Sequence, residues 1–310
     1  MSVSSWISSL LTLPFVVANE PLVRHTTMRV GGPAVVWVEP QTEAELTAFL
    51  EINQKVGAPL YVLGAGSNVV PTDDGWNGAV LHLGKGFGKS SVEGNVLIAG
   101  GGAFLPKLTH FANENRLGNF EWACGIPGSV GGSVWGNAGA RGFNGHGFEG
   151  RDAATDFDGC IAFDRRGRRH ELHKDDVEFS YRRSSLGQLI VTEARFALKP
   201  LSEEEAVTHK EGVRQLLDVR RKTQPANAAS AGCIWKNPKV EGCVSAGALV
   251  EQCGLKGQNC GPARVSEIHA NFIVNTGGAS SAQVRELAQY VEEEVEDQTG
   301  IKLEREARFL

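Results

Sequence analysis

A cysteine and two glutamates stand in short segments whose residue types suit proton transfer. Cys233 lies within SAGCIWKNP at 230–238, and Glu304 and Glu306 lie within LEREARF at 303–309. An ordinary thiol has a pKa near 8.5, so it is mostly protonated at neutral pH and can donate a proton. The two glutamates alternate with their neighbours as residues on an exposed face would. Taken singly, neither segment identifies a reaction.

A first glycine cluster, GAGSNV at 64–69, resembles part of a dinucleotide-binding fingerprint. We reject that interpretation because the third glycine is absent, no helical pattern follows directly, and Asp73 and Asp74 come too early for the ribose acid. Successive small residues can expose backbone N–H groups that bind an anion. An ordinary turn at the end of a strand explains the cluster equally well.

A second, denser glycine region begins at GIPGSVGG (125–132) and continues at NAGA (137–140). It is not a Walker loop, because Gly132 is followed by Ser133 rather than by the required lysine. A neutral, glycine-rich cradle suits an internal diphosphate such as that of FAD. The ten glycines between Cys124 and Gly150 also predict a shaped loop there, because each glycine costs about 1 kcal/mol in a helix interior relative to alanine.

Other polar residues allow two interpretations each. HELH at 170–173 lacks metalloprotease spacing and lies among arginines, which favours a solvated hairpin. His269 precedes an apolar strand and is either a packed structural histidine or a substrate contact. Arg182, within SYRRS at 180–184, would by itself be taken for a surface arginine.

The composition is that of a globular protein, with 310 residues, 41% apolar and 22% charged, and a net charge of −5. This charge gives no footprint for nucleic acid or anionic lipid, and we expect neither nucleic acid nor membrane as a partner. No basic residue precedes Arg24, so the basic part of a secretory signal is missing and a cytoplasmic protein is expected. The six cysteines show no metal-site spacing, so we expect no metal and, Cys233 excepted, free and mostly buried thiols.

Hydrophobic periodicity and capping residues predict the elements that must position these segments. Thr42 with Glu45, and Ser202 with Glu205, form capping boxes that open helices. A further helix is predicted over 105–115, and apolar spacing predicts another one through Val284 and Val295. Strands are predicted at 35–38, 60–63, 96–99, 160–163, 189–196 and 272–274.

Eight segments, in chain order, resemble the UDP-N-acetylenolpyruvoylglucosamine reductase family. The resemblance runs from about residue 20 to the last residue, and the length is that of the shorter form of the family. The segments that carry it are 25–34, 61–68, 125–140, 179–185, 230–238, 249–257, 265–275 and 300–309.

The resemblance implies an α+β protein with an FAD-binding fold of the vanillyl-alcohol-oxidase type. Two FAD-binding subdomains, at 1–85 and 86–200, would precede a UDP-sugar-binding domain at 201–310 whose last residues return to the active site. NADPH would reduce non-covalently bound FAD, and the reduced flavin N5 would give hydride to the enolpyruvyl ether of UDP-N-acetylglucosamine. The product is UDP-N-acetylmuramate, a peptidoglycan precursor, and we expect the enzyme to be a monomer.

The resemblance also assigns roles to individual residues. Arg182, Cys233 and Glu306 would be catalytic: Arg182 neutralises the charge that develops beside the substrate carboxylate, Glu306 places an acid near the same centre, and Cys233 gives the proton. Glu304 is left as a structural neighbour. FAD would be bound by Gly64, Ala65, Gly66, Ser67, Asn68, Gly125, Ile126, Pro127, Gly128, Ser129, Gly131, Gly132, Asn137, Ala138 and Gly139, and the substrate by Tyr181, Arg221, Lys222, Asn237 and His269.

The chain departs from the family pattern at Cys233, where serine is the common proton donor, at Ala229, where proline is frequent, and at Trp235, where phenylalanine is usual. We interpret the cysteine as functional, because a thiol is the stronger acid, although it is open to oxidation. Two alternatives remain: an FAD-dependent oxidase of the same fold, and a catalytically silent protein that binds flavin or a nucleotide sugar. An oxidase has no use for the segments around Cys233 and Glu306.

Overall fold

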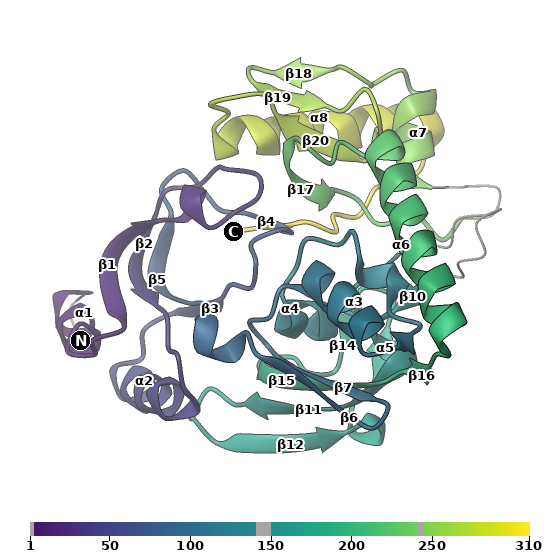
Figure 1. Cartoon of the computed structure of the whole chain (residues 1–310). Coiled ribbons are helices and arrows are strands. Elements are labelled where there is room, and N and C mark those ends of the chain that lie inside the picture. The colour runs from purple at the N-terminus through teal and green to yellow at the C-terminus, as the bar shows by residue number, and fades with distance from the viewer. Residues whose placement is uncertain (1–2, 141–149, 241–244) are drawn as a thin grey trace. The chain divides into compact units, whose positions relative to one another are not determined.

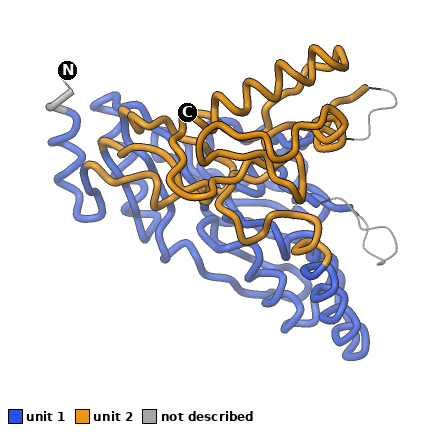
Figure 2. The backbone as a smooth tube through the Cα atoms, turned by 90° about the horizontal axis from the view of Figure 1, so that it is seen from above, with its two compact units in different colours: residues 1–18, 36–65, 78–218 blue, residues 19–35, 66–77, 219–310 orange. Residues whose placement is uncertain are grey.

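The computed structural model describes residues 3–140, 150–240 and 245–310. They group into two compact units: unit 1 consists of residues 1–18, 36–65 and 78–218, and unit 2 of residues 19–35, 66–77 and 219–310 (Figure 2). Neither unit is a single run of chain, because two early segments cluster with the C-terminal third. The three consecutive domains predicted from the sequence stay a prediction, although each of the three larger sheets falls within one of the predicted ranges.

The first sheet has the strand order β1-β2-β5-β3 (Figure 1). Helix α2 begins as its capping box predicts, since Thr42 Oγ1 accepts from the Glu45 N–H and the Glu45 carboxylate accepts from the Gln41 N–H. It ends at Gly57, which takes the left-handed conformation (φ +69°) that favours glycine. The elements are α1 (Val3–Leu10), β1 (Val16–Pro21), β2 (Pro33–Val38), α2 (Glu43–Val56), β3 (Leu60–Val62) and β5 (Trp76–Leu81).

The second sheet is antiparallel, with the order β12-β11-β15-β7-β6. Along β15, buried Ala194 and Phe196 alternate with half-buried Glu193 and Arg195, so one face meets the core and the other meets solvent. HELH lies at the end of this sheet in β12, paired with β11, which confirms the hairpin. The elements are β6 (Ser90–Glu93), β7 (Val96–Gly100), β11 (Phe157–Phe163), β12 (Arg169–His173) and β15 (Ile190–Ala197).

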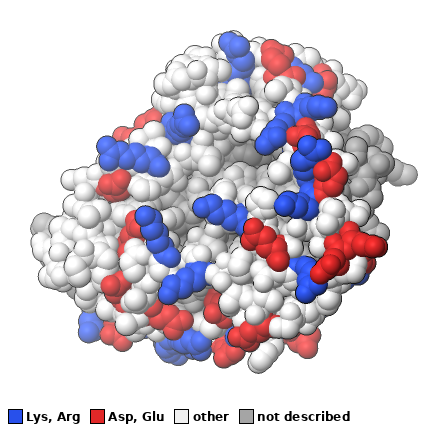
Figure 3. Space-filling model, viewed as in Figure 1, with Lys and Arg blue, Asp and Glu red and all other residues white. Residues whose placement is uncertain are grey.

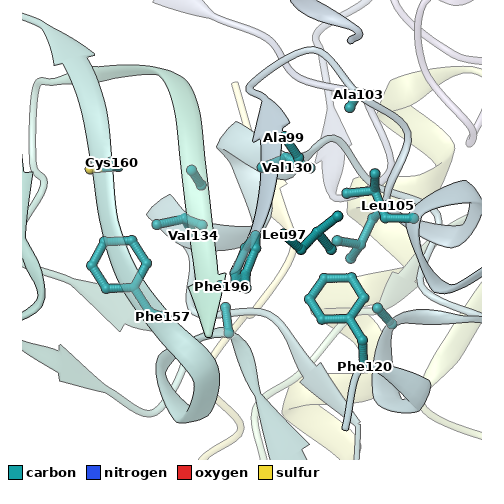
Figure 4. Packing of buried hydrophobic residues seen from close by; sticks show 14 of the residues in the cluster. Leu97, Ala99, Ala103, Leu105, Phe120, Val130, Val134, Phe157, Cys160 and Phe196 are labelled. Carbon is teal, nitrogen blue, oxygen red and sulfur yellow. The ribbon is translucent and has the colours of Figure 1, made fainter. Parts of the chain in front are cut away.

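The core of unit 1 lies between this sheet and two helices, α3 (Leu105–Glu114) and α4 (Val130–Trp135). Figure 4 shows Val130 and Val134 of α4 near Leu97 and Phe196 of the sheet. Phe196 also packs edge-on against Phe120, with 5.1 Å between the ring centroids. Tight packing on one sheet face therefore fixes the backbone on both sides of the glycine-rich segment at 125–132.

The third sheet, in unit 2, has the order β17-β20-β19-β18. Helix α8 (Ser281–Thr299) packs on it through the predicted face of Val284, Leu287, Ala288, Val291 and Val295, all fully or almost fully buried. Asp73 caps this helix by accepting from the N–H groups of Ser281 and Ala282. The strands and the remaining helix are β17 (Ala229–Cys233), β18 (Asn259–Cys260), β19 (Ala263–Val265), β20 (Phe272–Asn275) and α7 (Ala246–Gln252).

Shorter elements complete the chain. The long helix α6 (Glu203–Thr223) begins at the predicted capping box of Ser202 and Glu205. The short elements are β4 (Val69–Val70), η1 (Leu22–Arg24), η2 (Lys85–Phe87), β8 (Leu117–Gly118), η3 (Glu121–Ala123), β9 (Gly139–Ala140), β10 (Arg151–Asp152), α5 (Ala153–Asp156), η4 (Lys174–Asp176), β13 (Phe179–Ser180), β14 (Arg183–Ser184), β16 (Lys199–Pro200) and β21 (Arg308–Phe309).

On the face shown in Figure 3, lysine and arginine side chains are interspersed with aspartate and glutamate. Among the described residues, no helix is both long enough and apolar enough to cross a membrane.

Candidate active site

The two glycine clusters meet within unit 1. A Cβ added at Gly64 would lie 2.5 Å from Ser129 Oγ, so the end of the first cluster's strand lies directly against the second cluster. Across the described part of the chain, the N–H groups of Gly64, Ala65, Gly125 and Gly128 donate to no acceptor within the protein. Unpaired backbone donors on two adjoining segments are suited to an anionic group such as a diphosphate.

The segment at 125–132, which we call the cradle, is held from behind by backbone hydrogen bonds. The Leu105 N–H donates to the Gly128 carbonyl at 2.8 Å, and the Gly131 N–H donates to the Gly101 carbonyl at 2.8 Å. Gly131 must be glycine here, since a Cβ would lie 2.8 Å from the Val191 carbonyl oxygen. The cradle is therefore fixed before any ligand binds.

The prediction of a loop throughout 124–150 is wrong for residues 130–135, which form helix α4. Ser129 caps this helix by accepting from the Gly132 N–H, and Val130 and Val134 are fully buried. Burial of these two side chains outweighs the low helix propensity of Gly131 and Gly132. Residues 141–149 of the predicted loop lie outside the described residues.

Asn137, predicted to bind the cofactor, has a structural role in unit 1. It takes a left-handed conformation (φ +45°), and its side-chain Nδ2 donates to the Ser180 carbonyl at 3.0 Å and to Asp152 Oδ2 at 3.1 Å. Its Oδ1 accepts from the Ala154 N–H. The Ala138 N–H donates to the Ser133 carbonyl, so this stretch braces the cradle.

Tyr181 and Arg182 form the tip of a hairpin between β13 and β14. Arg182 has φ +58°, a conformation that costs a non-glycine residue of order 1 kcal/mol or more, and its guanidinium lies 5.4 Å from the centre of the Tyr181 ring. Ser184 Oγ donates to the Trp135 carbonyl at 2.6 Å, which joins the hairpin to the end of α4. The predicted cationic residue and the cradle thus belong to one braced assembly in unit 1.

Cys233 and Glu306 are brought together in unit 2. The Glu306 N–H donates to the carbonyl of Ile234 at 2.7 Å, and the Lys236 N–H donates to the Glu304 carbonyl at 2.8 Å. Cys233, at the end of β17, is half-buried and follows Gly232, whose φ of +74° turns the strand at a bulge. Two predicted catalytic residues therefore occupy adjoining positions on paired segments, while Arg182 belongs to unit 1.

Residues 66–68 of the first glycine cluster belong to unit 2 and contact these same segments. A Cβ at Gly66, where φ is +64°, would lie 1.9 Å from the His25 carbonyl oxygen, so only glycine fits. The Asn68 carbonyl accepts from the Arg308 N–H at 2.9 Å, and Asn68 Nδ2 donates to the Glu306 carbonyl at 3.3 Å. A Cβ at Gly232 would lie 3.8 Å from the Ser67 carbonyl oxygen.

Glu304 differs from Glu306 in exposure, although the sequence pattern predicts an exposed face for both. Its carboxylate is largely exposed and pairs with the Lys236 ammonium. Glu306 is half-buried. The assignment of Glu304 as a structural neighbour agrees with this pairing.

The predicted substrate residues of unit 2 have differing surroundings. His269 packs edge-on against Phe272, its Nδ1 accepts from the Asn271 N–H at 3.2 Å, and burial lowers its pKa. This geometry favours the packed interpretation of His269. Asn237 Oδ1 accepts from the Ala246 N–H and so orders the approach to α7, while Arg221 and Lys222 are exposed at the end of α6.

The other cysteines have surroundings unlike that of Cys233. Burial raises the pKa of Cys160 to about 11, which makes that thiol inert. Cys124 is buried, as predicted, whereas Cys253 and Cys260 are only half-buried. Cys243 lies outside the described residues, and no cluster of potential metal ligands is found within the described ranges.

Two residues that support this site were missed from the sequence. The buried side chain of Asn271 clamps the backbone of Trp235, accepting from its N–H at 2.9 Å and donating to its carbonyl at 2.9 Å. Glu292, on α8, accepts from the Trp235 indole N–H at 2.8 Å. The only available signal was Trp235 itself, because a buried indole N–H needs an acceptor.

Comparison with known families gives two matches along the chain. Residues 34–150 match the FAD binding domain, and residues 224–310 match the C-terminal domain of UDP-N-acetylenolpyruvoylglucosamine reductase. The chain is thus an α+β protein with an FAD-binding domain, as the sequence predicts.

Relatives cover nearly the whole chain. UDP-N-acetylenolpyruvoylglucosamine reductase 2 of Symbiobacterium thermophilum is 40% identical over 292 residues, which are 94% of this chain and 90% of the relative. The reductase of Bacillus subtilis is 36% identical over 298 residues, 95% of this chain and 94% of the relative. The crystal structure of UDP-N-acetylenolpyruvylglucosamine reductase from Thermus caldophilus is similar with a TM-score of 0.78 and 34% identity, covering 95% of this chain and 97% of that one.

Proposed function

The chain belongs to the UDP-N-acetylenolpyruvoylglucosamine reductase family, and we propose that it takes its electrons from NADPH and its proton from Cys233. It is an oxidoreductase with an FAD-binding domain that acts in peptidoglycan precursor synthesis. The proposal concerns how the residues of this particular chain carry out that reaction.

FAD would be held chiefly by backbone groups. The unpaired N–H groups of Gly64, Ala65, Gly125 and Gly128 form a neutral donor surface, which suits an internal diphosphate. When bound, FAD supplies hydride chemistry between the nicotinamide and the enolpyruvyl carbon. The rigid backing of the cradle allows this cofactor to be retained through the cycle without charged anchors.

The protein side chains must stabilise the developing negative charge and deliver the proton. Hydride addition to the terminal alkene carbon leaves negative charge on the adjacent carbon, beside the substrate carboxylate, and prepositioned donors stabilise such charge. Arg182, strained at its hairpin tip, is proposed to supply the cation. Glu306 and Cys233 are proposed to flank the carbon that receives the proton, and the Cys233 S–H bond breaks as the new C–H bond forms.

One observation carries this assignment: the 2.7 Å hydrogen bond from the Glu306 N–H to the Ile234 carbonyl. It fixes Glu306 beside the residue that follows Cys233, so an acid and a thiol occupy neighbouring positions. Delivery of one proton to one carbon requires one positioned acid, and Cys233 is proposed to be that acid.

The remaining proposals follow from the substrate class. Arg221, Lys222 and Asn237 are proposed to contact the UDP-sugar, since cationic and amide groups bind phosphate and sugar oxygens. We propose that the enzyme acts as a cytoplasmic monomer, with UDP-sugar and NADPH as its small-molecule partners.

An anaerobic experiment on two half-reactions tests the proposed function. The yellow holoenzyme is bleached with NADPH without oxygen, and the enolpyruvyl UDP-sugar is then added while flavin absorbance is followed. We expect rapid reoxidation by the sugar. No reoxidation would contradict the reductase reaction, and rapid reoxidation by oxygen alone would point to an oxidase.

Variants of Cys233 test the proton donor separately. Cys233→Ala should bleach with NADPH at the parent rate but reoxidise about a hundredfold more slowly, because it lacks a positioned acid. Cys233→Ser should retain turnover. Equal reoxidation of the alanine variant and the parent would remove Cys233 from the mechanism.

A further inference from the structure

A fully buried indole ties the segment after Cys233 to helix α8. Trp235 has no exposed surface, and its Nε1–H donates to Glu292 Oε1 at 2.8 Å. An indole N–H buried without an acceptor costs about 1–3 kcal/mol. Glu292 is therefore needed once tryptophan occupies this position.

The same carboxylate holds the segment that carries Glu306. Arg305 donates to Glu292 through Nε at 2.6 Å and through a terminal nitrogen at 2.8 Å, a two-point arrangement. The Arg305 guanidinium also lies 4.5 Å from the centre of the Phe309 ring. A two-point Arg–carboxylate pair fixes direction as well as distance.

The two residues that share Glu292 stand opposite each other in the backbone. Trp235 and Arg305 form an isolated antiparallel bridge. Successive side chains of an extended segment point to opposite faces, so Glu304 and Glu306 lie on the face opposite that of the Arg305 side chain. The largely exposed Glu304, paired with Lys236, agrees with that alternation.

We propose that Glu292 is a positioning residue for the proton-transfer step. One carboxylate, on a helix packed against the core of unit 2, sets the spacing between the Cys233 segment and the Glu306 segment. The inference rests on the proposed function of Cys233 and Glu306. A misplacement of about 1 Å in a reacting group can cost about a hundredfold in rate.

A positioning role for Glu292 and a purely structural role predict different kinetics. Loss of a structural residue would lower thermal stability and slow both half-reactions alike. Loss of a positioning residue should slow only the step that uses Cys233 and Glu306, which is reoxidation by the enolpyruvyl UDP-sugar.

The test compares Glu292→Gln with Glu293→Gln, its exposed neighbour on the same helix, in the FAD-loaded full chain. In Glu292→Gln the amide still accepts from Trp235 but loses the charged, two-point contact to Arg305. We expect reoxidation about tenfold to a hundredfold slower, with reduction by NADPH within about twofold of the parent. Glu293→Gln should match the parent in both half-reactions.

Two further variants keep the test decisive. Arg305→Lys keeps the charge but loses the planar fork, so it should slow reoxidation in the same selective way. Trp235→Phe needs no acceptor and leaves Glu292 on Arg305, so its loss should be only a few-fold. The same selective loss in Arg305→Lys would support the proposal even if Glu292→Gln failed to fold.

Three outcomes would overturn it. Reoxidation of both Glu292→Gln and Arg305→Lys at the parent rate would show that the carboxylate does not position the pair. Equal slowing of both half-reactions would show a structural role. A parent enzyme that the UDP-sugar does not reoxidise would overturn the proposed function itself, whereas a reactive parent with equally reactive variants overturns only the positioning role.

Discussion

The cradle at 125–132 and the C-terminal segment at 303–309 keep their shapes by different means. The cradle is held by backbone hydrogen bonds, such as that from Gly131 to the carbonyl of Gly101, and by close backbone contacts that exclude a Cβ. The C-terminal segment is held by side chains, chiefly Glu292 on Arg305. Adding a side chain should therefore disrupt the cradle, whereas removing a side chain should disrupt the C-terminal segment.

This difference fits the role that we propose for each region. A cofactor that stays bound needs hydrogen-bond donors in fixed positions. Backbone N–H groups provide such donors without a loss of side-chain conformational entropy. Proton transfer needs an acid held at a set distance from the reacting carbon, and a charged network can orient the side chain that supplies it. Four variants should affect the two regions differently, and they are given in order of decreasing expected effect.

Glu306→Gln against Glu304→Gln should give the largest contrast. Removing the Glu306 carboxyl group should slow reoxidation by the UDP-sugar at least about a hundredfold, because an acid beside the reacting carbon is lost. Glu304→Gln should stay within about twofold, since the exposed pair with Lys236 contributes little. Stopped-flow measurement of both half-reactions checks this, and equal losses in the two variants would refute the distinction.

Asn271→Ala should be the next largest. The change leaves the backbone N–H and carbonyl of Trp235 without their side-chain partner, at about 1–3 kcal/mol for each buried group. We expect a lower melting temperature and slower reoxidation. Asn259→Ala, at an exposed position of β18, serves as control, and a melting temperature equal to that of the control would contradict the clamp.

Gly131→Ala tests the cradle in the opposite sense, by adding a methyl group. Alanine normally stabilises a helix by about 1 kcal/mol relative to glycine, but here its Cβ would lie 2.8 Å from the Val191 carbonyl oxygen. The steric clash should outweigh the gain in helix propensity. We expect a net loss of about 1–3 kcal/mol in the free energy of unfolding and a lower flavin content. The ratio of flavin to protein absorbance measures this.

Gly94→Ala provides the control for that experiment. A Cβ there meets open space, although φ is +63°, so a small loss of stability with normal flavin content is expected. An equal loss of flavin in both variants would show that strain, rather than close approach in the cradle, decides binding.

Glu121 lies in η3, shortly before the cradle. Unlike the cradle, it is held by a charged side-chain contact, with His209. Burial raises the pKa of Glu121, but the hydrogen bond and attraction of His209 outweigh it, so the net pKa lies below the usual 4.5. A lowered carboxyl pKa gives stability that is present above the unfolded value and is lost as pH falls through the folded one. Glu121→Gln should therefore melt a few degrees lower at neutral pH.

The acid limb of that variant is the smallest expected effect. On acidification, the parent should lose melting temperature more steeply than Glu121→Gln below about pH 4.5. Calorimetry from neutral to acid pH measures both curves. Parallel curves would show that the pair with His209 contributes nothing to the region before the cradle.

The helices with caps could be predicted from the sequence, because a cap is a local interaction. Thr42 with Glu45, and Ser202 with Glu205, marked helix starts that the structure confirms. Helix α4 was missed because Gly131 and Gly132 lower local propensity, whereas its stability comes from Val130 and Val134 packing on a distant strand. Helix propensity depends on the local sequence alone and therefore cannot predict such packing.

The candidate site was only partly predictable for the same reason. The family resemblance predicted catalytic roles for Cys233 and Glu306, but the hydrogen bond from Glu306 to Ile234 joins segments that are far apart in sequence. Asn137 carried a cofactor assignment, yet its side chain is occupied inside unit 1. Glu292 belongs to no sequence motif, because its contacts with Trp235 and Arg305 form only in the folded chain.

The assembly of unit 2 from three separate stretches has a consequence during synthesis on the ribosome. Strand β4 pairs in parallel with β21 near the last residue, and Asp73 caps α8, so residues 66–77 emerge long before their partners exist. At about 5–20 residues per second this wait lasts on the order of ten to fifty seconds. Met28, Val30 and Val70, all buried in the finished core, stay without their core partners during that wait, which makes the nascent chain prone to aggregation.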